Sequence, residues 1–479
     1  MNQTLPAFHA RTRLALLLGA GSLLAGCASV PDLPASPALL PASQLQSQQT
    51  LPGSHGEWAG AHWWQRYQDP QLDQLMQEAL AQSPSLDSAR ARLLQAEGLA
   101  QQAGATRQPG VSANGDFTRL RQSLNNGMPA AFVPPGFNTS SRVALDVSYE
   151  LDFWGKNRSA IAAASSEQAA AQAELAQSRL LLTTAVASQY AELARLFADR
   201  DACQQALKVR SQSEGLMRER ESQGLENRAS VAQAASRRAA AEADLLAAEE
   251  AITLQRQALA ALLGAGPDRG LALQRPALNV SQAQALPATL AANLIGHRPD
   301  LAAARLRAEA AASRIQVARA GFYPNVNLSA YVGTQSLGLD ELTRGGSGIA
   351  GFGPAISLPL FRQDALQGSY RSARGEYDSA VASYNQTLLQ ALQDIAQAYT
   401  RQQGLTAQLA QRQQAAEAAE RAWELTHDRY QGGLASYLDV LNAEDSVIAA
   451  RRTLTQLQSQ QAQLDIALTK ALGGDKQPA

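Results

Sequence analysis

The chain contains two copies of one unit, and this internal duplication constrains its fold more than any other feature of the sequence. Residues 83–86 (SPSL) recur as residues 298–301 (RPDL), and residues 107–109 (RQP) recur as residues 322–324 (FYP), at one constant separation. Three later matches keep a second, slightly shorter separation: Tyr190 with Tyr399, Gly224 with Gly433, and Leu263 with Leu472. Because the register holds over such long stretches, we expect two structural repeats of one design.

Each copy is predicted to contain an opening helix, two strands joined by a loop, a very long helix, a turn and a closing helix. The very long segments contain no proline, so at about 1.5 Å rise per residue each can extend roughly 100 Å. A proline interrupts each opening helix once, at Pro84 and at Pro299, because the residue before a proline is pushed out of the α region. The predicted helices are residues 71–107, 157–222 and 226–263 in the first copy, and residues 287–322, 363–431 and 435–472 in the second.

The long helices carry the spacing of helices that pack against neighbours along their length. Their apolar side chains recur at steps of three and four residues, and alanine is abundant between them, which lets helices approach closely. The residues concerned are Leu182, Val186, Tyr190, Leu193 and Phe197 in the first copy, and Leu388, Leu392, Ile395 and Tyr399 in the second.

The predicted strands alternate apolar and polar side chains, so one face suits lipid and the other suits water. Every odd position from Val143 to Phe153 is apolar, and the positions between them are mostly polar. Residues 325–332 and 352–360 alternate in the same way, and residues 111–118 show the weakest pattern. We therefore expect four strands in each chain, two from each copy.

Four amphipathic strands cannot close into a barrel by themselves, and open sheet edges are not tolerated inside a bilayer. Closure therefore requires several chains. Transmembrane barrels have even strand numbers of about eight or more, so a dimer with eight strands and a trimer with twelve both remain open. An even number of strands returns the chain to the side it left, which places all long helices on one side of the membrane and residues 120–141 and 336–347 in the opposite loops.

The N-terminus has the layout of a secretory signal. Arg11 and Arg13 precede an apolar run over residues 14–24, which is too short to span a bilayer, and small residues follow. A short buried helix with an incidental cysteine is the alternative interpretation. Residues 24–27 (LAGC) resemble a bacterial lipobox, which implies that Cys27 becomes the lipidated first residue of the mature protein, and Ala28 fits sorting to the outer membrane. Cys203 is then the only remaining thiol, so no internal disulfide can form.

These features predict the following organisation along the chain. Residues 1–26 are the signal peptide, residues 27–61 a lipid-anchored extended tether rich in Pro, Ser, Ala and Gln, residues 62–270 the first repeat, residues 271–286 a linker, residues 287–474 the second repeat, and residues 475–479 a disordered tail.

Several classes of function are disfavoured by the residues present. The formal net charge is -1, so no basic field exists to hold nucleic acid. The five histidines show no metal-ligand spacing, and no Gly-x-Ser-x-Gly motif occurs. Residues 346–351 (GSGIAG) match a dinucleotide fingerprint on paper but precede a strand pattern rather than a helix. We expect no enzyme activity, no metal and no cofactor other than the covalent lipid on Cys27.

Several motifs resemble the outer membrane factor family, the TolC-like proteins, and especially its NodT-type efflux lipoproteins. They are residues 63–72 (WWQRYQDPQL), 149–156 (YELDFWGK), 298–301 (RPDL), 353–361 (GPAISLPLF) and 471–474 (ALGG), and together they span nearly the whole mature chain in the right order. The resemblance implies a mixed α + β membrane protein, with four β-strands and long α-helices per chain, that trimerises into a twelve-stranded β-barrel continuous with a twelve-helix periplasmic α-barrel.

The same resemblance implies the outer-membrane exit duct of a tripartite efflux pump. Its partners would be a periplasmic adaptor (membrane fusion) protein, an inner-membrane transporter, outer-membrane lipid and two further copies of the chain. Such a duct would passively conduct small molecules to the cell exterior. The alternative is a trimeric, surface-anchored coiled-coil protein with a structural or adhesive role, although such a stalk needs neither the duplication nor the two-faced strands.

In the family, the helix turns that face the pump form a constricted tip. The corresponding residues here lie within 220–231 and 430–442, and relatives place charges at the positions of Ala435 and Asn442, where this chain has none. We therefore expect Tyr430, Leu438, Asp439 and Asn442 to form the tip or gate, with Leu438 as ordinary packing and Asp439 as a turn cap being the alternative roles. Gly224 and Gly433 are predicted to allow the two tight turns.

Three acidic residues alternate on the polar side of the first copy's second strand. We expect Asp146, Glu150 and Asp152 to face the barrel lumen, where they either bias passage toward cations or are simply solvated.

Overall fold

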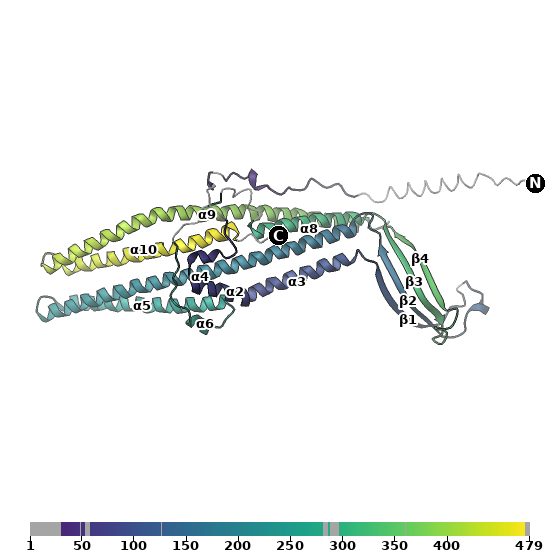
Figure 1. The fold of residues 1–479 in the computed structure, drawn as a ribbon, viewed down its shortest axis with the longest axis horizontal. Coiled ribbons are helices and arrows are strands. Elements are labelled where there is room, and N and C mark those ends of the chain that lie inside the picture. The colour runs from purple at the N-terminus through teal and green to yellow at the C-terminus, as the bar shows by residue number, and fades with distance from the viewer. Residues whose placement is uncertain are drawn as a thin grey trace, which may run out of the picture. The chain divides into compact units, whose positions relative to one another are not determined.

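The computed structural model describes residues 30–47, 49–52, 58–125, 127–280, 286–287, 297–359 and 361–474 (Figure 1). The predicted signal peptide, Cys27, most of residues 287–298 in the second opening helix, and the tail 475–479 lie outside these ranges. The chain divides into two compact units, and each unit takes parts from both copies. The first unit contains Leu94–Ala170 and Ala304–Ser383, and the second contains Leu39–Leu93, Ala171–Ala303 and Tyr384–Ala479.

The first unit contains a four-stranded antiparallel sheet in the order β1-β2-β3-β4 (Figure 1). Its strands are β1 (Gly110–Leu120), β2 (Asn138–Glu150), β3 (Asn325–Leu337) and β4 (Gly348–Ser357). The first copy supplies β1 and β2, and the second supplies β3 and β4. Within the described residues, β1 and β4 each pair with only one strand, so each leaves one edge open.

The pairing register places the apolar positions of all four strands on one face. Directly paired residues share a face of a sheet, and here apolar residues pair with apolar residues across every strand boundary. The pairs include Val111 with Val147, Leu145 with Val332, Val147 with Ala330, Tyr149 with Leu328, Ala330 with Phe352, and Val326 with Ile356. Phe352 is 95% exposed in the single chain. The predicted two-faced sheet is therefore confirmed.

Several strand boundaries differ from the prediction. The alternation predicted a strand that reaches Phe153, but β2 ends at Glu150. The reason is that Asp152 accepts hydrogen bonds from the backbone N–H groups of Asn157 and Arg158 and so caps the helix that follows. Strand β4 begins at Gly348 rather than Phe352, because residues 348–351 already pair with β3.

The helices follow the predicted plan closely. The long helices are α4 (Lys156–Ser222) and α9 (Gln363–Gln431), and the closing helices are α5 (Arg228–Leu262) and α10 (Tyr437–Leu472). The first opening helix is split at Pro84 as predicted, into α2 (Pro70–Gln82) and α3 (Pro84–Ala105), and α8 (Pro299–Ala320) begins at the equivalent proline. The short elements are η1 (Ala42–Gln44), η2 (Trp63–Tyr67), η3 (Ala130–Phe132) and α6 (Asp268–Leu271).

No helix in the described ranges combines the length and the apolar character that a bilayer crossing needs.

The second unit is built around aromatic residues next to the first opening helix. Trp63, Trp64 and Tyr67 are buried against α2, α4 and α5. The hydroxyl of Tyr67 donates to Asp465 on α10 at 2.6 Å, and that of Tyr190 on α4 donates to Asp69 at 2.8 Å. The Tyr67–Asp465 contact joins the two copies, because α10 belongs to the second. Of the apolar positions predicted from helical spacing, all are buried except Tyr399, which is half-buried.

Candidate functional site

The turn between α4 and α5 reverses the chain through a glycine. Gly224 has φ +75°, a conformation that favours glycine because it has no Cβ. The backbone N–H of Leu225 donates to the carbonyl of Arg220 at 2.8 Å, and that of Gly224 donates to Glu221 at 2.9 Å. This pair of bonds is a Schellman motif, which satisfies the last carbonyls of a helix. Asn227 then caps α5 through its side chain.

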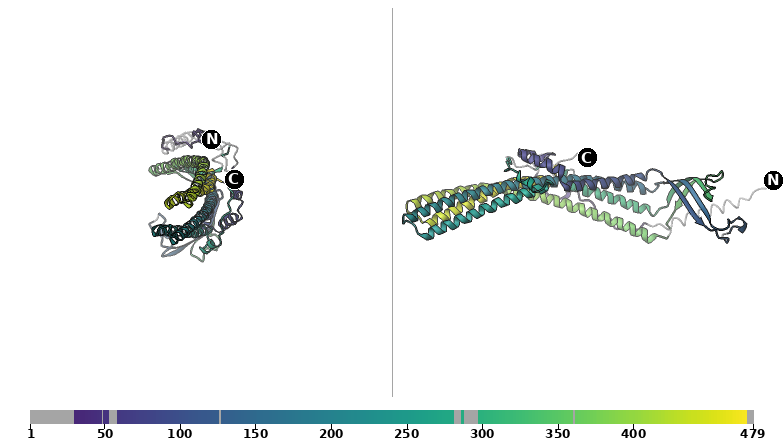
Figure 2. Two further views of the ribbon diagram at one scale, coloured as in Figure 1. Left: turned by 90° about the vertical axis from the view of Figure 1, so that its left-hand side faces the viewer. Right: turned by 90° about the horizontal axis from the view of Figure 1, so that it is seen from below.

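The turn between α9 and α10 repeats this geometry. Gly433 has φ +71°, the N–H of Leu434 donates to the carbonyl of Arg429 at 2.7 Å, and the N–H of Gly433 donates to Tyr430 at 3.0 Å. Ser436 occupies the N-cap position of α10. Both glycines thus lie in tight turns between consecutive helices, and we call α4–α5 and α9–α10 the first and second hairpins. Figure 2 shows the first hairpin in teal and the second in green to yellow, and the turns and closing helices of both lie within the second unit.

Residues predicted for the gate occupy different environments at the start of α10. Asp439 completes a capping box, since its carboxylate accepts from the backbone N–H and the hydroxyl of Ser436 at 2.9 and 2.7 Å. These hydrogen bonds hold the pKa of Asp439 below its usual range. Leu438 is 54% exposed, and Asn442, one helical turn later, is exposed as well. Leu438 and Asn442 thus share an unpacked face of α10.

Tyr430, the remaining gate candidate, is buried between the hairpins. Its ring packs in a cluster with Met217 and Ala234 of the first hairpin and with Tyr437, Val440 and Leu441 of the second. Its hydroxyl donates to the carboxylate of Glu226 at 3.1 Å, and the guanidinium of Arg220 lies 4.6 Å from the ring centroid. Burial raises the pKa of Tyr430 to about 12, so the hydroxyl stays protonated at neutral pH. Tyr430 therefore links the second hairpin to the first.

A buried ionic network crosses between the hairpins about two to three helical turns from the helix ends that flank the two turns. Arg210 on α4 contacts both Glu444 and Asp445 on α10, and Arg237 on α5 contacts Asp445. The side chains of Arg210 and Glu444 are only 5% and 3% exposed. Ser213 donates a further hydrogen bond to Glu444 at 2.8 Å. Burial raises the pKa of Glu444 despite these partners.

Sequence reasoning missed this network. Arg210 and Glu444 lie far apart along the chain, and neither belongs to a motif, so only the packing of one hairpin against the other brings them together. A weak signal was present, because charged residues make up only 17% of the chain and Glu444 and Asp445 are adjacent.

Two of the predicted lumen carboxylates, Asp146 and Glu150, lie on β2, and the third, Asp152, follows the end of the strand. Each of the three has a partner. Asp146 pairs with Arg142 at 2.6 Å, and Glu150 pairs with Lys156 at 3.1 Å. Asp152 caps α4, as described above. Since two of the three charges are balanced locally and the third stabilises a helix terminus, their influence on passing cations remains a prediction.

Within the described ranges, no three His, Cys, Asp or Glu side chains are grouped closely enough to hold a metal ion. The thiol of Cys203 is buried on α4, and burial raises its pKa, which opposes formation of a nucleophilic thiolate.

Comparison with protein families identifies matches over both copies. The sequence model of the outer membrane efflux protein family matches residues 75–265 and 290–474. Multidrug resistance outer membrane protein MdtP of Escherichia coli O6:H1 is 32% identical over 476 residues, which cover 98% of this chain and 97% of MdtP. Fusaric acid resistance protein FusA of Burkholderia cepacia is 33% identical over 377 residues, which cover 77% of this chain and 70% of FusA.

Solved structures share the fold along most of the chain. The outer membrane protein VceC of Vibrio cholerae superposes with a TM-score of 0.83 at 46% sequence identity, and the match covers 88% of this chain and all (100%) of VceC. The outer-membrane channel OprN superposes with a TM-score of 0.82 at 25% identity, over 94% of this chain and 98% of OprN.

Proposed function

This chain belongs to the outer membrane efflux protein family, and from that premise we propose how it forms its duct. The family consists of ducts rather than enzymes, and the chain is an outer-membrane exit duct for efflux. Three copies contribute four strands each to a twelve-stranded barrel that continues into a periplasmic barrel of twelve helices. The wall encloses a water-filled lumen, and small molecules pass along this lumen passively from the periplasm to the exterior.

The two-faced sheet with its open edges carries this proposal. One continuous apolar face suits lipid, whereas β1 and β4 each retain an unpaired edge in the described structure. Each unpaired backbone N–H or C=O group in the core of a bilayer costs a free energy of about several kcal/mol, because no water is present to satisfy it. Strands β1 and β4 run antiparallel to each other in the sheet order, so β4 of one copy can pair with β1 of the next.

Two measurements on the purified protein test the duct. In planar lipid we expect discrete single-channel currents, and native mass measurement in detergent should give three copies. A coiled-coil stalk would give a trimer without conductance, so a trimer that never conducts would favour that alternative.

A tripartite pump supplies the driving force in this proposal. The duct has no energy source of its own, so an inner-membrane transporter expels the cargo and a periplasmic adaptor joins the transporter to the helix ends. Names of the relatives mention multidrug and fusaric acid resistance, which supports small organic toxins as cargo. Deletion of the gene followed by sensitivity profiling with dyes, detergents, antibiotics and metals tests the cargo class.

The helix-end turns form the constriction of the resting duct. The exposed pair Leu438 and Asn442 faces the passage, and Tyr430 and the Arg210–Glu444 network hold the second hairpin against the first. Opening then requires the two hairpins to separate. Engineered cysteine cross-links between neighbouring tips should abolish efflux, whereas full resistance with complete cross-linking would contradict the gating role.

The mature protein is anchored by lipid at Cys27, which lies outside the described residues. A covalent lipid adds membrane affinity in proportion to its buried methylene groups, and it places residues 28–61 as a tether. Cys27→Ser should abolish palmitate labelling and weaken outer-membrane retention while trimers still assemble. Labelling that persists in this variant would refute the anchor.

A further inference from the structure

Two arginines extend the apolar face of the sheet at the loop end of β1. Odd-numbered residues of β1 lie on this face, as the pairing with β2 shows. Phe117 is the last apolar residue of the row, and Arg119 follows on the same face, where it pairs with Thr139. Arg121 comes directly after the strand and is exposed, as Arg119 is. Two cations therefore lie at one end of a face that otherwise suits lipid.

Both arginines lie beyond the apolar band of the sheet. The last apolar residues of this face toward the loops are Phe117 on β1, Val143 on β2 and Val332 on β3. Thr139, the partner of Arg119, precedes Val143 by roughly 13 Å along β2, at about 3.3 Å per residue. An apolar band flanked by aromatic residues marks the part of a barrel wall that lies in the bilayer. The arginines are therefore at the level of the lipid headgroups.

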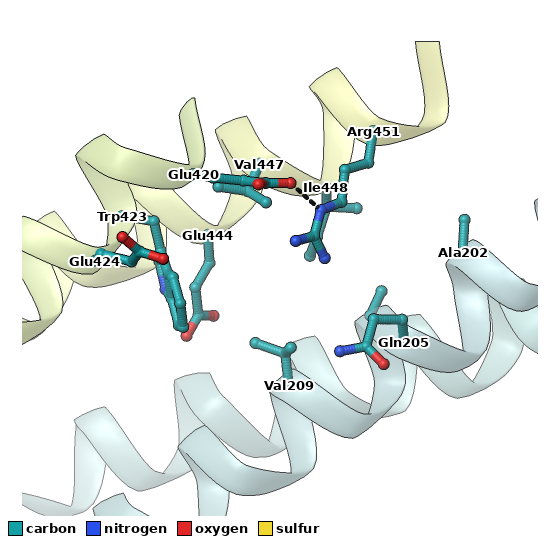
Figure 3. Close-up of a pocket in the computed structure, with 11 residues that line it drawn as sticks. Ala202, Gln205, Val209, Glu420, Trp423, Glu424, Glu444, Val447, Ile448 and Arg451 are labelled. Atoms are coloured by element: carbon teal, nitrogen blue, oxygen red, sulfur yellow. Dashed lines mark hydrogen bonds and ion pairs between the residues drawn. The ribbon is translucent and has the colours of Figure 1, made fainter. Parts of the chain in front are cut away.

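The guanidinium groups of both arginines are free within the part of the chain that the structure describes. Two other arginines show the contrast. Arg451 on α10 has its charge balanced by Glu420 on α9 at 2.6 Å (Figure 3). Arg344, in the loop between β3 and β4, is balanced by Glu341 at 2.5 Å. The loop end of β1 thus carries two uncompensated positive charges, whereas the arginine of the loop between β3 and β4 is paired.

Free arginines at a membrane surface attract anionic headgroups, and each arginine raises the affinity by about fivefold. The planar guanidinium binds phosphate oxygens through two parallel hydrogen bonds. A phosphomonoester carries about −1.5 to −2 charges at neutral pH, so one such group balances both arginines. A phosphodiester carries a single negative charge and leaves one arginine uncompensated. The chemistry of the pair therefore favours a phosphomonoester.

We propose that Arg119 and Arg121 bind the phosphomonoester headgroup of a lipid in the outer leaflet. Phe117 and Phe137 contact the upper part of its acyl chains, since their side chains are 54% and 64% exposed. The choice of the outer leaflet rests on the proposed duct, whose helices occupy the periplasmic side and whose strand loops therefore face the exterior. A trimer has three such sites, one for each β1.

Lipid A is a suitable probe, because it is a glycolipid that carries two phosphomonoesters. Native mass measurement of the purified full-length trimer in detergent should show saturable binding of lipid A, up to three molecules per trimer. Lipid A from which both phosphates have been removed should bind about 25-fold more weakly, since it loses the attraction of two arginines. Phosphatidylglycerol, a phosphodiester lipid, should bind about fivefold more weakly than lipid A.

Variants of the two arginines separate charge from general contact with lipid. Arg119→Gln and Arg121→Gln should each weaken the binding of lipid A by about fivefold, and the double variant by about 25-fold. Binding of the dephosphorylated lipid should not change in any of them. Arg344→Gln is the matched control, because Arg344 is an exposed arginine of the other strand loop whose charge is already balanced, and it should change nothing.

Equal affinity for lipid A and its dephosphorylated form would overturn the proposal, as would undiminished binding in the double variant. A double variant that no longer forms trimers would also overturn it and would assign the arginines to contacts between copies. Phosphatidylglycerol bound as tightly as lipid A would overturn the choice of a phosphomonoester lipid. Conductance of the same samples separates this inference from the duct: trimers that conduct but bind no lipid A refute only the lipid site.

Discussion

At the end of α4 the chain turns through Gly224 and enters α5 behind Asn227, and at the end of α9 it turns through Gly433 and enters α10 behind Ser436. The backbone bonds of the two turns are the same, residue for residue. Their side chains differ, since the second turn alone has a reciprocal capping box and a tyrosine that reaches the other hairpin. Backbone geometry was retained after duplication while side chains diverged.

The divergence made the hairpins complementary. At the separation that aligns the two glycines, Arg210 corresponds to Ala419, Glu444 to Ala235 and Asp445 to Ser236. The first copy therefore supplies the positive charges of the buried network and the second copy supplies the negative charges. Two identical hairpins could not form this network. The packing of one hairpin against the other therefore depends on contacts between unlike copies, and the following predictions test it.

Removal of Glu444 should have the largest effect. Glu444→Ala leaves Arg210 buried with only the more exposed Asp445, so we expect the local opening free energy of α10 to fall by about 3 kcal/mol, with longer channel openings. Hydrogen exchange of α10 measures the first change and planar-lipid recording the second. Glu242→Ala breaks an exposed pair within α5 and should cost about 0.5 kcal/mol at most. Equal losses of free energy in the two variants would show that contacts between the hairpins stabilise them no more than contacts within one hairpin.

The two glycines should respond alike. A Cβ at either position meets no atom within 4 Å, so Gly224→Ala and Gly433→Ala should each cost about 1.5 kcal/mol from the left-handed conformation alone. Hydrogen exchange in the flanking turns of α4 and α9 measures both. A large difference between the two free-energy costs would show that, at one of the turns, the left-handed conformation is not the main reason for the loss of stability.

The caps should respond differently. Asn227→Ala should cost about 1 kcal/mol, and Ser436→Ala should cost more, because it also removes the hydroxyl that donates to Asp439. The pKa of Asp439 is lowered in the folded state, so its contribution is present above the usual aspartate range and is lost as pH falls through that lowered pKa. Ser436→Ala should therefore reduce the acid sensitivity of α10, measured by melting temperature against pH. Unchanged sensitivity would rule out the reciprocal cap.

The pH dependence of stability that arises from Glu444 should be the smallest effect. The pKa of Glu444 is raised in the folded state, so its contribution is complete below the ordinary glutamate pKa and is lost as pH rises through the raised value. The melting temperature should thus fall slightly across that window. Glu444→Gln should flatten the profile, and a profile that persists in this variant would assign the dependence to other groups.

Local patterns were enough to predict most of the fold. Proline-free runs, glycine turns and paired prolines located α4, α5, α9 and α10 to within two residues, because these signals act on the neighbouring backbone. The end of β2 was missed, since apolar alternation continues to Phe153 while Asp152 has already begun to cap α4. The alternation of apolar and polar residues indicates which face of a sheet each side chain occupies. It does not indicate where a helix cap such as Asp152 ends the strand.

The candidate site was less predictable because its contacts cross between copies. Position along α10 indicated Asp439, but its role as a cap depends on Ser436 within the same turn, which the sequence allowed as an alternative. The burial of Tyr430 depends on Met217 and Glu226 of the other hairpin. The partner of Arg210 could not be read from any local pattern, since it exists only after the hairpins pack.

Pairing between sheet edges of neighbouring copies is the central requirement of the duct. In a Cys203→Ser background, Ser112→Cys on β1 can be combined with Ala355→Cys or Gly353→Cys on β4, which lie on the same face as Ser112. Oxidation should produce a covalent ladder that ends at three copies for at least one combination, and none for either single variant. No ladder in any register along the strands, or a ladder that extends beyond three, would contradict the closed trimer.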